Sequence, residues 1–571
     1  MKKYYFYILF ILPVFLVAQV IPITSTETLD LSVYGETVSY AGEEEYQIFL
    51  SVDNILDKPI IVVDGFDPGD TRDIPGLYSL LNFTDTSGTQ NLADIVRAEG
   101  FDVVILNFPT YLRAADGATI DGGSDFIDRN AMILVELLDI INTAKAPNSP
   151  DQNVIIGPSM GGIIARYALN YMESESALNA DTRLYISFDS PHHGANVPIG
   201  LQHQLNYLAF NDTNAVTEVQ PLIEGLLKSS AARQLLIDHF EPHLLGSSIV
   251  DFDPTLTLPE EHPFRTTFES RINSFTSTGF PGNVRNVAII NGSGIGNPYL
   301  AKDGVTPVTN GFSVLDTTLP VDVPTPLGDI TINVELEINF TPAAGTPLQV
   351  SRFFAPIPIF PDVLSTASSG TTNFDGVDAA PGGLFDISAL TGDIGIGGGI
   401  GADFLAALQI DKFNFIPSIS ALALEITDEA NDDNIDWHHD IDIASRGTTN
   451  NTPFVNTFLP DDNEPHVQLT EENVAFALSK ILTPPLSIPD EAILKIQLEK
   501  NPVQNQLVLL SNSSSVSHLS ITDITGKLVY NNIITLDTRT IIPVNLNSGF
   551  YLLHISDGKH QSFTTKLVFR N

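Results

Sequence analysis

The sequence predicts an α/β fold with a mainly parallel sheet, followed by a small all-β domain at the C-terminal end. Short apolar runs alternate with helical patterns through the first half of the 571 residues, which is typical of strands joined by helical crossovers. Period-two alternation replaces this pattern near the end of the chain. A chain of this length also exceeds one ordinary core, so two or more domains are expected.

Five buried strands are expected, because each is a short apolar run bounded by turn residues. They cover residues 60–63, 101–108, 154–156, 184–188 and 287–291. Helices are expected where apolar residues recur every three or four positions, over 91–99, 125–143, 160–172 and 472–482. Their alternation with the strands implies a parallel sheet that is covered on both faces.

Two long segments depart from this alternation of strands and helices. Residues from about 200 to 280 are predicted to form a helical cap, with 222–240 as its clearest helix. Residues from about 309 to 426 are predicted to be a β-rich insertion, because 330–340 alternates with period two between Pro- and Gly-rich stretches. The main domain is thus expected over 20–482, followed by a linker over 483–492 and a β-sandwich over 493–571.

The first nineteen residues have the pattern of a signal peptide. Lys2 and Lys3 precede an apolar run over 4–17, and Ala18 and Gln19 follow it. The run is short for a bilayer crossing, and no later segment is apolar for long enough, so no transmembrane helix is expected in the mature chain.

Composition narrows the choice of partners. The 27 Lys and Arg residues against 69 Asp and Glu give a formal charge of −42, which disfavours nucleic acid and anionic membrane surfaces as partners. The chain has no cysteine, so disulfides and thiol chemistry are excluded. Stability must therefore come from core burial and from any cations that the carboxylates hold.

One short motif predicts nucleophilic chemistry. Gly157-Pro158-Ser159-Met160-Gly161 stands between the expected strand 154–156 and the expected helix 160–172. Such a turn holds a serine in a strained backbone conformation and presents its hydroxyl at the carboxyl edge of the sheet. We predict that Ser159 is a catalytic nucleophile; the alternative is an ordinary glycine-rich turn.

These residues, with Ile164-Ala-Arg-Tyr167 and Ser190-Pro-His-His-Gly194, resemble the lipase and esterase branch of the α/β-hydrolase family. The resemblance covers roughly residues 46–310 and 450–482. It implies an α/β-hydrolase fold with a helical cap, and a serine hydrolase that cleaves carboxylic esters through an acyl-enzyme. Pro158 stands where the family usually has histidine, which bears on substrate fit.

The serine needs a base, and the family's chain order places it after the last core strand and before the final helix. His466 lies in that loop, whereas the rivals His192 and His193 come too early in the chain. The acid that orients the base has two candidates. Asp303 is favoured because it follows the strand 287–291, where the family's acid usually lies, and Asp189 matches the alternative position of some lipases.

The oxyanion that forms on acyl transfer needs two backbone donors. We expect them to be the N–H groups of Met160, next to the nucleophile, and of Phe66, after Gly65. Asp64 stands where the family often has histidine, and its negative charge is expected to point away from the oxyanion.

No cofactor is required for this chemistry, although calcium is possible. Asp432, Asn434 and Asp436 present oxygen ligands at alternate positions, but the glycine of a calcium loop is missing, which favours a solvated acidic loop. His438 and His439 beside them are candidate metal ligands, with a surface cluster as the favoured alternative.

The end of the chain carries a second resemblance. Asn501-Pro-Val503, Ile524-Thr-Gly-Lys-Leu-Val529 and Leu546-Asn-Ser-Gly-Phe-Tyr-Leu-Leu553 together resemble the C-terminal sorting domain of the type IX secretion system. This implies passage through the periplasm and outer membrane, then release or attachment at the cell surface, with the secretion machinery as a partner.

The function predicted from the sequence is therefore a secreted lipase-like or esterase-like serine hydrolase acting on a lipid or small-molecule ester. Two alternatives remain: a surface binding or adhesion protein whose hydrolase fold has lost activity, and an acyltransferase.

Overall fold

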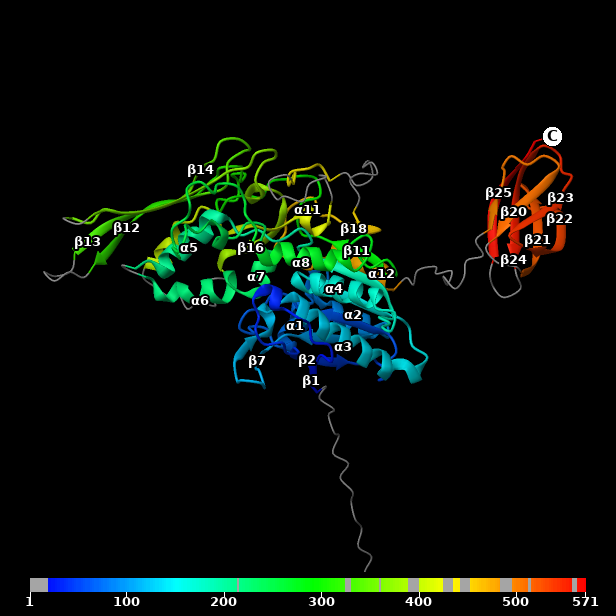
Figure 1. Cartoon of the computed structure of the whole chain (residues 1–571), viewed down its shortest axis with the longest axis horizontal. Coiled ribbons are helices and arrows are strands. Elements are labelled where there is room, and N and C mark those ends of the chain that lie inside the picture. Colours follow the sequence, from blue (N-terminus) through cyan, green and yellow to red (C-terminus); the bar gives the residue numbers. More distant parts are fainter. Residues whose placement is uncertain are drawn as a thin grey trace, which may run out of the picture. The chain divides into compact units, whose positions relative to one another are not determined.

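A computed structural model of the chain describes residues 19–212, 215–323, 330–358, 361–388, 400–424, 435–441, 452–482, 496–511, 515–556 and 562–570 (Figure 1). The chain divides into two compact units, Met1–Leu482 and Thr483–Asn571. The predicted signal peptide over 1–19, Gln19 apart, lies outside the described residues, as does the predicted linker over 483–492.

The first unit is built on an eight-stranded sheet in the order β1-β2-β6-β3-β9-β10-β11-β18. The strand β2 runs opposite to the other seven strands and is antiparallel to both of its neighbours, β1 and β6. From β6 to β18 every pairing is parallel. The strands are β1 (Ile21–Thr24), β2 (Glu43–Phe49), β3 (Pro59–Val63), β6 (Asp102–Asn107), β9 (Asn153–Pro158), β10 (Thr182–Phe188), β11 (Arg285–Ile289) and β18 (Asn456–Phe458). The mainly parallel sheet that the sequence predicts is confirmed.

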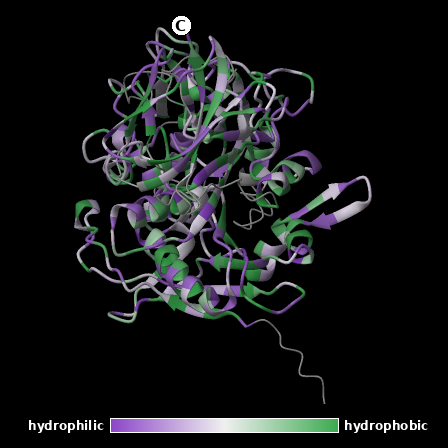
Figure 2. Cartoon of the chain, turned by 90° about the vertical axis from the view of Figure 1, so that its right-hand side faces the viewer, coloured by the Kyte–Doolittle hydropathy of each residue, from purple (hydrophilic) through white to green (hydrophobic). Residues whose placement is uncertain are grey.

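Helices cover both faces of this sheet. Since successive residues of a strand point to opposite faces, neighbouring residues of one strand pack against different helices. Ile61 and Val63 pack with α3 (Ile127–Lys145) and α4 (Met160–Ser174), whereas Ile60 and Val62 pack on the other face. That second face is covered by α1 (Ile74–Leu80), α2 (Leu92–Ala98) and α12 (Glu471–Ile481). Figure 2 shows hydrophobic and hydrophilic stretches interspersed along the ribbons.

The cap that follows β10 is helical but more broken than the sequence suggests. It contains α5 (Ile199–Phe210), α6 (Gln220–Leu222), α7 (Ser230–Leu235) and α8 (Pro263–Ser274). The helix expected over 222–240 is divided and shorter than predicted: Ile223–Leu227 forms a π-helical turn, the Ser229 side chain accepts the N–H of Ala232 and starts a new helix, and that helix ends at Leu235. Capping by serine explains the break.

The segment after β11 is rich in β-structure. β12 (Ser313–Val323), β13 (Ile330–Asn339), β14 (Leu348–Ala355) and β15 (Val363–Ser369) form an antiparallel sheet. A separate antiparallel pair follows, β16 (Gly382–Asp386) with β17 (Lys412–Pro417), and the helices are α10 (Ile400–Ala407) and α11 (Ser418–Ala421). Two small antiparallel pairs lie earlier in the unit: β4 (Asn82–Asp85) with β5 (Gly88–Asn91), and β7 (Thr110–Leu112) with β8 (Thr119–Asp121).

The second unit is all-β, as the sequence predicts. Its two antiparallel sheets have the orders β19-β20-β23 and β22-β21-β24-β25. Buried side chains from both sheets, Leu507, Leu519, Leu553 and Leu567 among them, form one core. The strands are β19 (Ile496–Leu498), β20 (Gln506–Ser511), β21 (Ser515–Asp523), β22 (Leu528–Leu536), β23 (Arg539–Pro543), β24 (Gly549–Ser556) and β25 (Ser562–Phe569).

Candidate active site

Ser159 sits at a sharp bend between β9 and α4. Its backbone has φ 53° and ψ −132°, a conformation that L-residues rarely adopt. The Ser159 N–H donates to the carbonyl of Phe188 on the neighbouring strand at 2.9 Å, which ties the bend to the edge of the sheet. The geometry is that of a serine held in strain at the carboxyl ends of parallel strands.

The glycines of the motif are required by space. A Cβ atom at Gly157 would lie 2.5 Å from the Cα of Gly162, and a Cβ atom at Gly161 would lie 2.3 Å from the carbonyl oxygen of Val63. Both distances are far shorter than van der Waals contact. The tight bend therefore depends on residues without side chains on either side of Ser159.

His466 reaches Ser159 from the loop between β18 and α12. Its Nε2 lies 2.8 Å from the Ser159 Oγ, and its Nδ1 lies 2.7 Å from the Oδ2 of Asp189. The three side chains thus form a chain of two hydrogen bonds, the arrangement in which an imidazole can take a hydroxyl proton while a carboxylate orients it.

The structure brings Asp189, and not Asp303, to the imidazole. Asp189 follows β10 and is fully buried. Asp303, the acid that the sequence favours, lies instead on an exposed turn, where its carboxylate accepts the N–H groups of Val305 and Thr306. Its side chain is engaged in its own turn, so the geometry favours Asp189, the alternative acid from the sequence, over Asp303.

Asn291 connects the acid to the loop that carries the base. Its backbone N–H donates to the Oδ1 of Asp189 at 3.1 Å. Its side-chain Nδ2 donates to the Oε2 of Glu464 at 2.8 Å and to the carbonyl of Gln468 at 3.0 Å, which are positions on either side of His466. One fully buried residue therefore contacts both the acid and the loop of the base.

The β16–β17 pair supports the same loop from the insertion. The His466 N–H donates to the carbonyl of Leu384 at 2.8 Å, and the Leu384 N–H donates to the carbonyl of Glu464 at 2.9 Å. The Phe415 ring meets the imidazole edge-on, with centroids 5.1 Å apart. Gly383 lies against the acid, because a Cβ atom there would come within 1.9 Å of the Asp189 Oδ2.

The two expected oxyanion donors come from segments next to the nucleophile: Met160 follows Ser159 in the chain, and Gly65, before Phe66, packs on it. Met160 is the first residue of α4, and an amide in that position has no partner within its helix. Gly65, which precedes Phe66, packs on the serine, since a Cβ atom at Gly65 would lie 3.1 Å from the Cβ of Ser159. These positions are compatible with an oxyanion site between the two backbones.

Asp64 is held beside this site by local contacts. Its Oδ1 accepts the N–H of Gly65 at 2.7 Å and lies 3.4 Å from the guanidinium of Arg72. Arg72 also donates to the carbonyl of Phe66 at 2.8 Å. Burial raises the pKa of Asp64 to about 7, although Arg72 opposes this rise.

Two parts of the chain match described families. Residues 59–223 match the family described as PGAP1-like alpha/beta domain, and residues 501–570 match the family described as secretion system C-terminal sorting domain. The first unit has the α/β-hydrolase fold. The second unit is a sorting domain of the type IX secretion system, which indicates secretion or a cell-surface location for the protein.

Solved α/β-hydrolases resemble the chain at low identity. The serine hydrolase XC6422 from Xanthomonas campestris is 17% identical, over 30% of this chain and 62% of that one, with a TM-score of 0.18. Est1E from Butyrivibrio proteoclasticus is 10% identical, over 43% and 73%, with a TM-score of 0.22. The peroxisomal hydrolase Lpx1 from Saccharomyces cerevisiae is 15% identical, over 48% and 74%, with a TM-score of 0.24. The chain thus spans less than two thirds of XC6422, and no curated protein matches it.

The other histidines of the hydrolase unit lie elsewhere. His192 is buried between Phe280 and Phe454, with its Nε2 2.8 Å from the Ser187 Oγ. Burial lowers the pKa of His193 to about 4. Neither bonds to Ser159, so the structure gives these rival bases no contact with the nucleophile.

The acidic loop holds no metal site among the residues that can be described. Asp432 and Asn434 lie outside them, and Asp436 accepts the N–H of His438 and lies 3.3 Å from the His439 ring. Within the described ranges no group of three or more His, Cys, Asp or Glu side chains could hold a metal ion. None of the described helices has the length and hydropathy of a membrane span.

Several contributors to the site were not predicted from the sequence, among them Asn291, Gly383 and Arg72. Asn291 stands at the end of an expected strand, where a polar residue after an apolar run is a usable signal. Gly383 carries no such signal, because its role depends on a contact with Asp189 from a remote part of the chain.

Proposed function

We propose that the protein is a secreted serine hydrolase that cleaves carboxylic esters through an acyl-enzyme. The observation that carries the proposal is the pair of hydrogen bonds on His466, 2.8 Å to the Ser159 Oγ and 2.7 Å to the Asp189 Oδ2. A serine in a strained bend, a base within proton-transfer distance and a fully buried carboxylate are the parts that acyl transfer to a hydroxyl needs.

The first half of the reaction forms the acyl-enzyme. His466 Nε2 takes the Ser159 proton as Oγ attacks the ester carbonyl, and the carbonyl oxygen becomes an oxyanion. The N–H groups of Met160 and Phe66 donate to that oxygen. The imidazolium then gives its proton to the departing alkoxide, so that the C–O bond breaks and an alcohol leaves.

The second half restores the enzyme. Water attacks the acyl carbon while His466 removes one of its protons, and the proton then returns to the Ser159 Oγ as the carboxylic acid departs. Asp189 stays ionised throughout, holds the Nδ1–H tautomer and stabilises the transient imidazolium. Its contact with the Asn291 N–H keeps the carboxylate aimed at the ring.

Covalent labelling tests the nucleophile directly. We expect a fluorophosphonate to modify Ser159 in the wild-type protein, as mapped by mass spectrometry of the labelled peptide. Ser159→Ala should lose the label and the turnover of p-nitrophenyl esters of graded acyl length. Ser174→Ala, an exposed serine near the end of the same helix α4, is the matched control and should behave as wild type.

The outcome also separates the alternatives. Turnover that survives Ser159→Ala removes the proposed nucleophile. A folded wild-type protein that neither labels nor turns over any ester supports a binding protein that keeps only the hydrolase fold. Loss of both signals in Ser159→Ala alone supports the proposed chemistry.

A further inference from the structure

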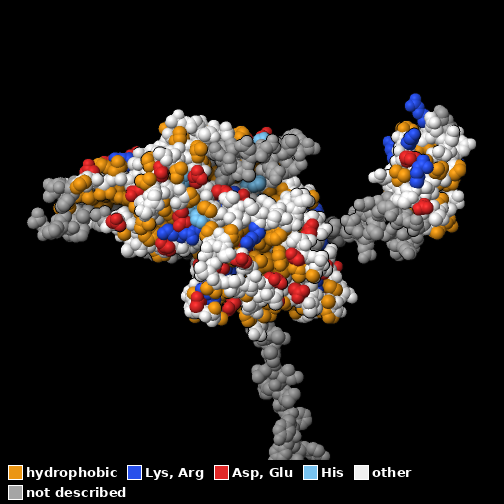
Figure 3. Space-filling model, in the orientation of Figure 1, with side chains coloured by type: hydrophobic (Ala, Val, Ile, Leu, Met, Phe, Trp, Pro, Cys, Tyr) orange, Lys and Arg blue, Asp and Glu red, His pale blue; other side chains and the backbone are white. Residues whose placement is uncertain are grey.

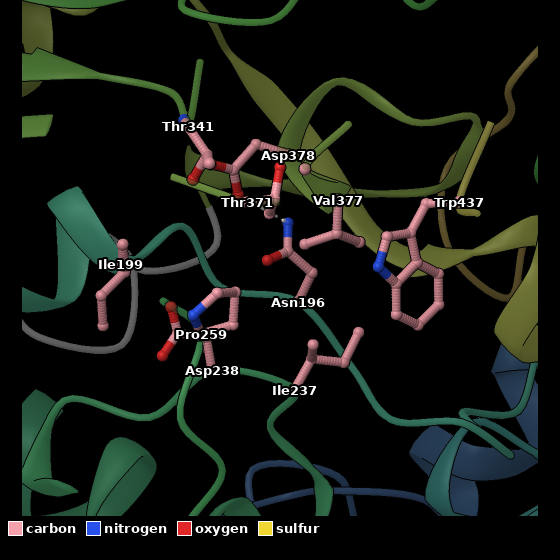
Figure 4. A pocket seen from close by; sticks show the side chains of 11 residues that line it. Asn196, Ile199, Ile237, Asp238, Pro259, Thr341, Thr371, Val377, Asp378 and Trp437 are labelled. Atoms are coloured by element: carbon pink, nitrogen blue, oxygen red, sulfur yellow. Dashed lines mark hydrogen bonds between the residues drawn. The ribbon is translucent and has the colours of Figure 1, made fainter. Parts of the chain in front are cut away.

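A small cavity whose lining does not include Ser159, Asp189 or His466 lies where three parts of the hydrolase unit meet (Figure 4). Asn196 comes from the segment after β10, Asp238 from the cap, and Thr371 and Asp378 from the insertion. The volume of about 20 Å³ suits one water-sized occupant. Whatever fills it touches core, cap and insertion at once.

One acceptor oxygen in this cavity is buried without a hydrogen-bond partner within the described part of the chain. The Thr371 hydroxyl is buried, with 3% of the residue exposed, and has no hydrogen-bond partner there. Both hydrogen bonds of Asp238 go to Oδ1, from the His243 Nε2 and the Glu260 N–H, and this leaves Oδ2 for another ligand.

The amide of Asn196 adds a third oxygen. Its Nδ2 donates to the Oδ1 of Asp378 at 3.2 Å and to the carbonyl of Asn414 at 3.0 Å. These two acceptors settle which end of the amide is nitrogen, so its Oδ1 is the atom left to accept. Figure 4 shows the Asn196 side chain between Asp378 and Asp238, with its oxygen turned away from Asp378.

The cavity is lined by two buried carboxyl groups. Asp378 is 3% exposed and Asp238 is 8% exposed, and no Lys or Arg is among the described residues that line the cavity. His243 pairs with Asp238, whereas the contacts of Asp378 are the neutral donors Asn196 and the Thr341 N–H. Burying a carboxylate without a cation is costly, and a water molecule would satisfy oxygens without supplying the missing charge.

We propose that this cavity is a calcium site that links the core, the cap and the insertion. Carboxylate, amide and hydroxyl oxygens, from Asp238, Asp378, Asn196 and Thr371, are the donors that Ca²⁺ takes, and its flexible shell of six to eight oxygens accepts water and backbone carbonyls beside them. The chain has no cysteine, so no disulfide can join these three segments. The site is independent of the proposed ester chemistry.

Calcium binding to the full chain tests this. After EGTA treatment and gel filtration, titration with CaCl₂ should give one bound Ca²⁺ per chain by calorimetry and by elemental analysis. The single tryptophan, Trp437, lines the cavity, so its fluorescence should change in step with binding. The midpoint of thermal unfolding should be higher with calcium than with EGTA. A wild-type chain that binds no stoichiometric calcium overturns the proposal and leaves a buried water as the occupant.

Two variants locate the ion. Asp378→Asn and the isosteric Thr371→Val should each weaken calcium binding by about 10-fold or more, since even the outer shell of a metal site is worth that much. Asp303→Asn, an exposed carboxylate on a distant turn, should bind as wild type. If Asp378→Asn does not fold, Thr371→Val decides. Wild-type affinity in Thr371→Val, or in a folded Asp378→Asn, contradicts the assignment.

Discussion

Positive backbone φ angles gather around the proposed triad. Ser159 has φ 53°, Asp189 has φ 48°, and Val467, next to the base, has φ 52°. Such conformations cost non-glycine residues of order 1–3 kcal/mol each and persist only where the surroundings impose them. All three members of the proposed triad are therefore positioned by strained backbone at or beside them, as expected of a site that is set before substrate arrives.

The acid gives the sharpest prediction at this scale. Asp189→Asn should lower kcat by about 10⁴-fold, because the amide favours the wrong imidazole tautomer. Asp303→Asn should leave kcat within a factor of two or so, since Asp303 only caps an exposed turn. Steady-state kinetics on a p-nitrophenyl ester check both. A large loss in Asp303→Asn with an unchanged Asp189→Asn would contradict the geometry.

Asn291 is predicted to be a positioning residue. Asn291→Ala removes the hydrogen bonds to Glu464 and Gln468 but keeps the backbone bond to Asp189, so the loop of His466 should loosen. We expect kcat to fall by about 10- to 100-fold with little change in KM, since a misplacement near 1 Å has costs of that order. Equal losses in kcat and in folded fraction, seen by circular dichroism, would indicate a merely structural role.

Asp64 should make stability depend on pH. Its pKa is raised from 3.8 to about 7 in the folded protein, so the folded state binds the proton more tightly than the unfolded state. Stability from this group is then present at low pH and is lost as the pH rises from about 4 to 7, by at most about 1.4 kcal/mol per pH unit. Asp64→Asn should flatten that slope in urea unfolding; an unchanged slope would exclude Asp64 as its source.

At the scale of elements, the β16–β17 pair belongs to the site. It meets the loop of His466 through two backbone hydrogen bonds at Leu384, and it packs Gly383 on the acid and Phe415 on the base. Backbone hydrogen bonds do not depend on which side chains the two residues carry. The contact between the insertion and the loop of His466 therefore does not require a particular side chain at Leu384.

Gly383→Ala tests this support. A methyl group there would lie 1.9 Å from the Asp189 Oδ2, so either the β16–β17 pair or the acid must move. We expect kcat to fall by more than about 10-fold while the cap and sheet stay folded. Gly225→Ala, in a position with nothing within 4 Å of the added carbon, should keep full activity. Activity of Gly383→Ala at the wild-type level would show that the β16–β17 pair does not fix the position of the Asp189 side chain.

At the scale of the whole molecule, the two units have different charge. Acidic side chains are spread over the visible face of the hydrolase unit in Figure 3, whereas the described part of the sorting domain carries Lys500, Lys527, Arg539, Lys566 and Arg570 against three carboxylates, Glu499, Asp523 and Asp537. Each unit also has its own hydrophobic core. Separate cores are what allow one unit to be removed without unfolding the other.

Truncation after Leu482 should therefore separate export from chemistry. We expect the shortened protein to be retained inside the cell and to be missing from the culture medium and the cell surface, as followed by immunoblotting of cell fractions. Its kcat on a soluble ester should stay within about two-fold of the full chain. Normal export of the truncated chain would contradict the role of the sorting domain.

Local sequence patterns are sufficient to predict the α/β fold and to identify Ser159 and His466 as candidate catalytic residues. These predictions depend on local patterns: an apolar run, a glycine-flanked serine and a loop before an amphipathic helix. Each pattern is contained within about twenty consecutive residues. The sorting domain was visible for the same reason, since its motifs are short and ordered along the chain.

The preference for Asp189 over Asp303 depends on the three-dimensional arrangement of remote segments. Both follow buried strands, so local pattern treats them alike. The choice depends on where the His466 ring points, and that depends on Asn291 and on the β16–β17 pair, which begins almost two hundred residues after Asp189. Contacts between remote segments form only when the sheet brings them to one edge, which no local pattern encodes.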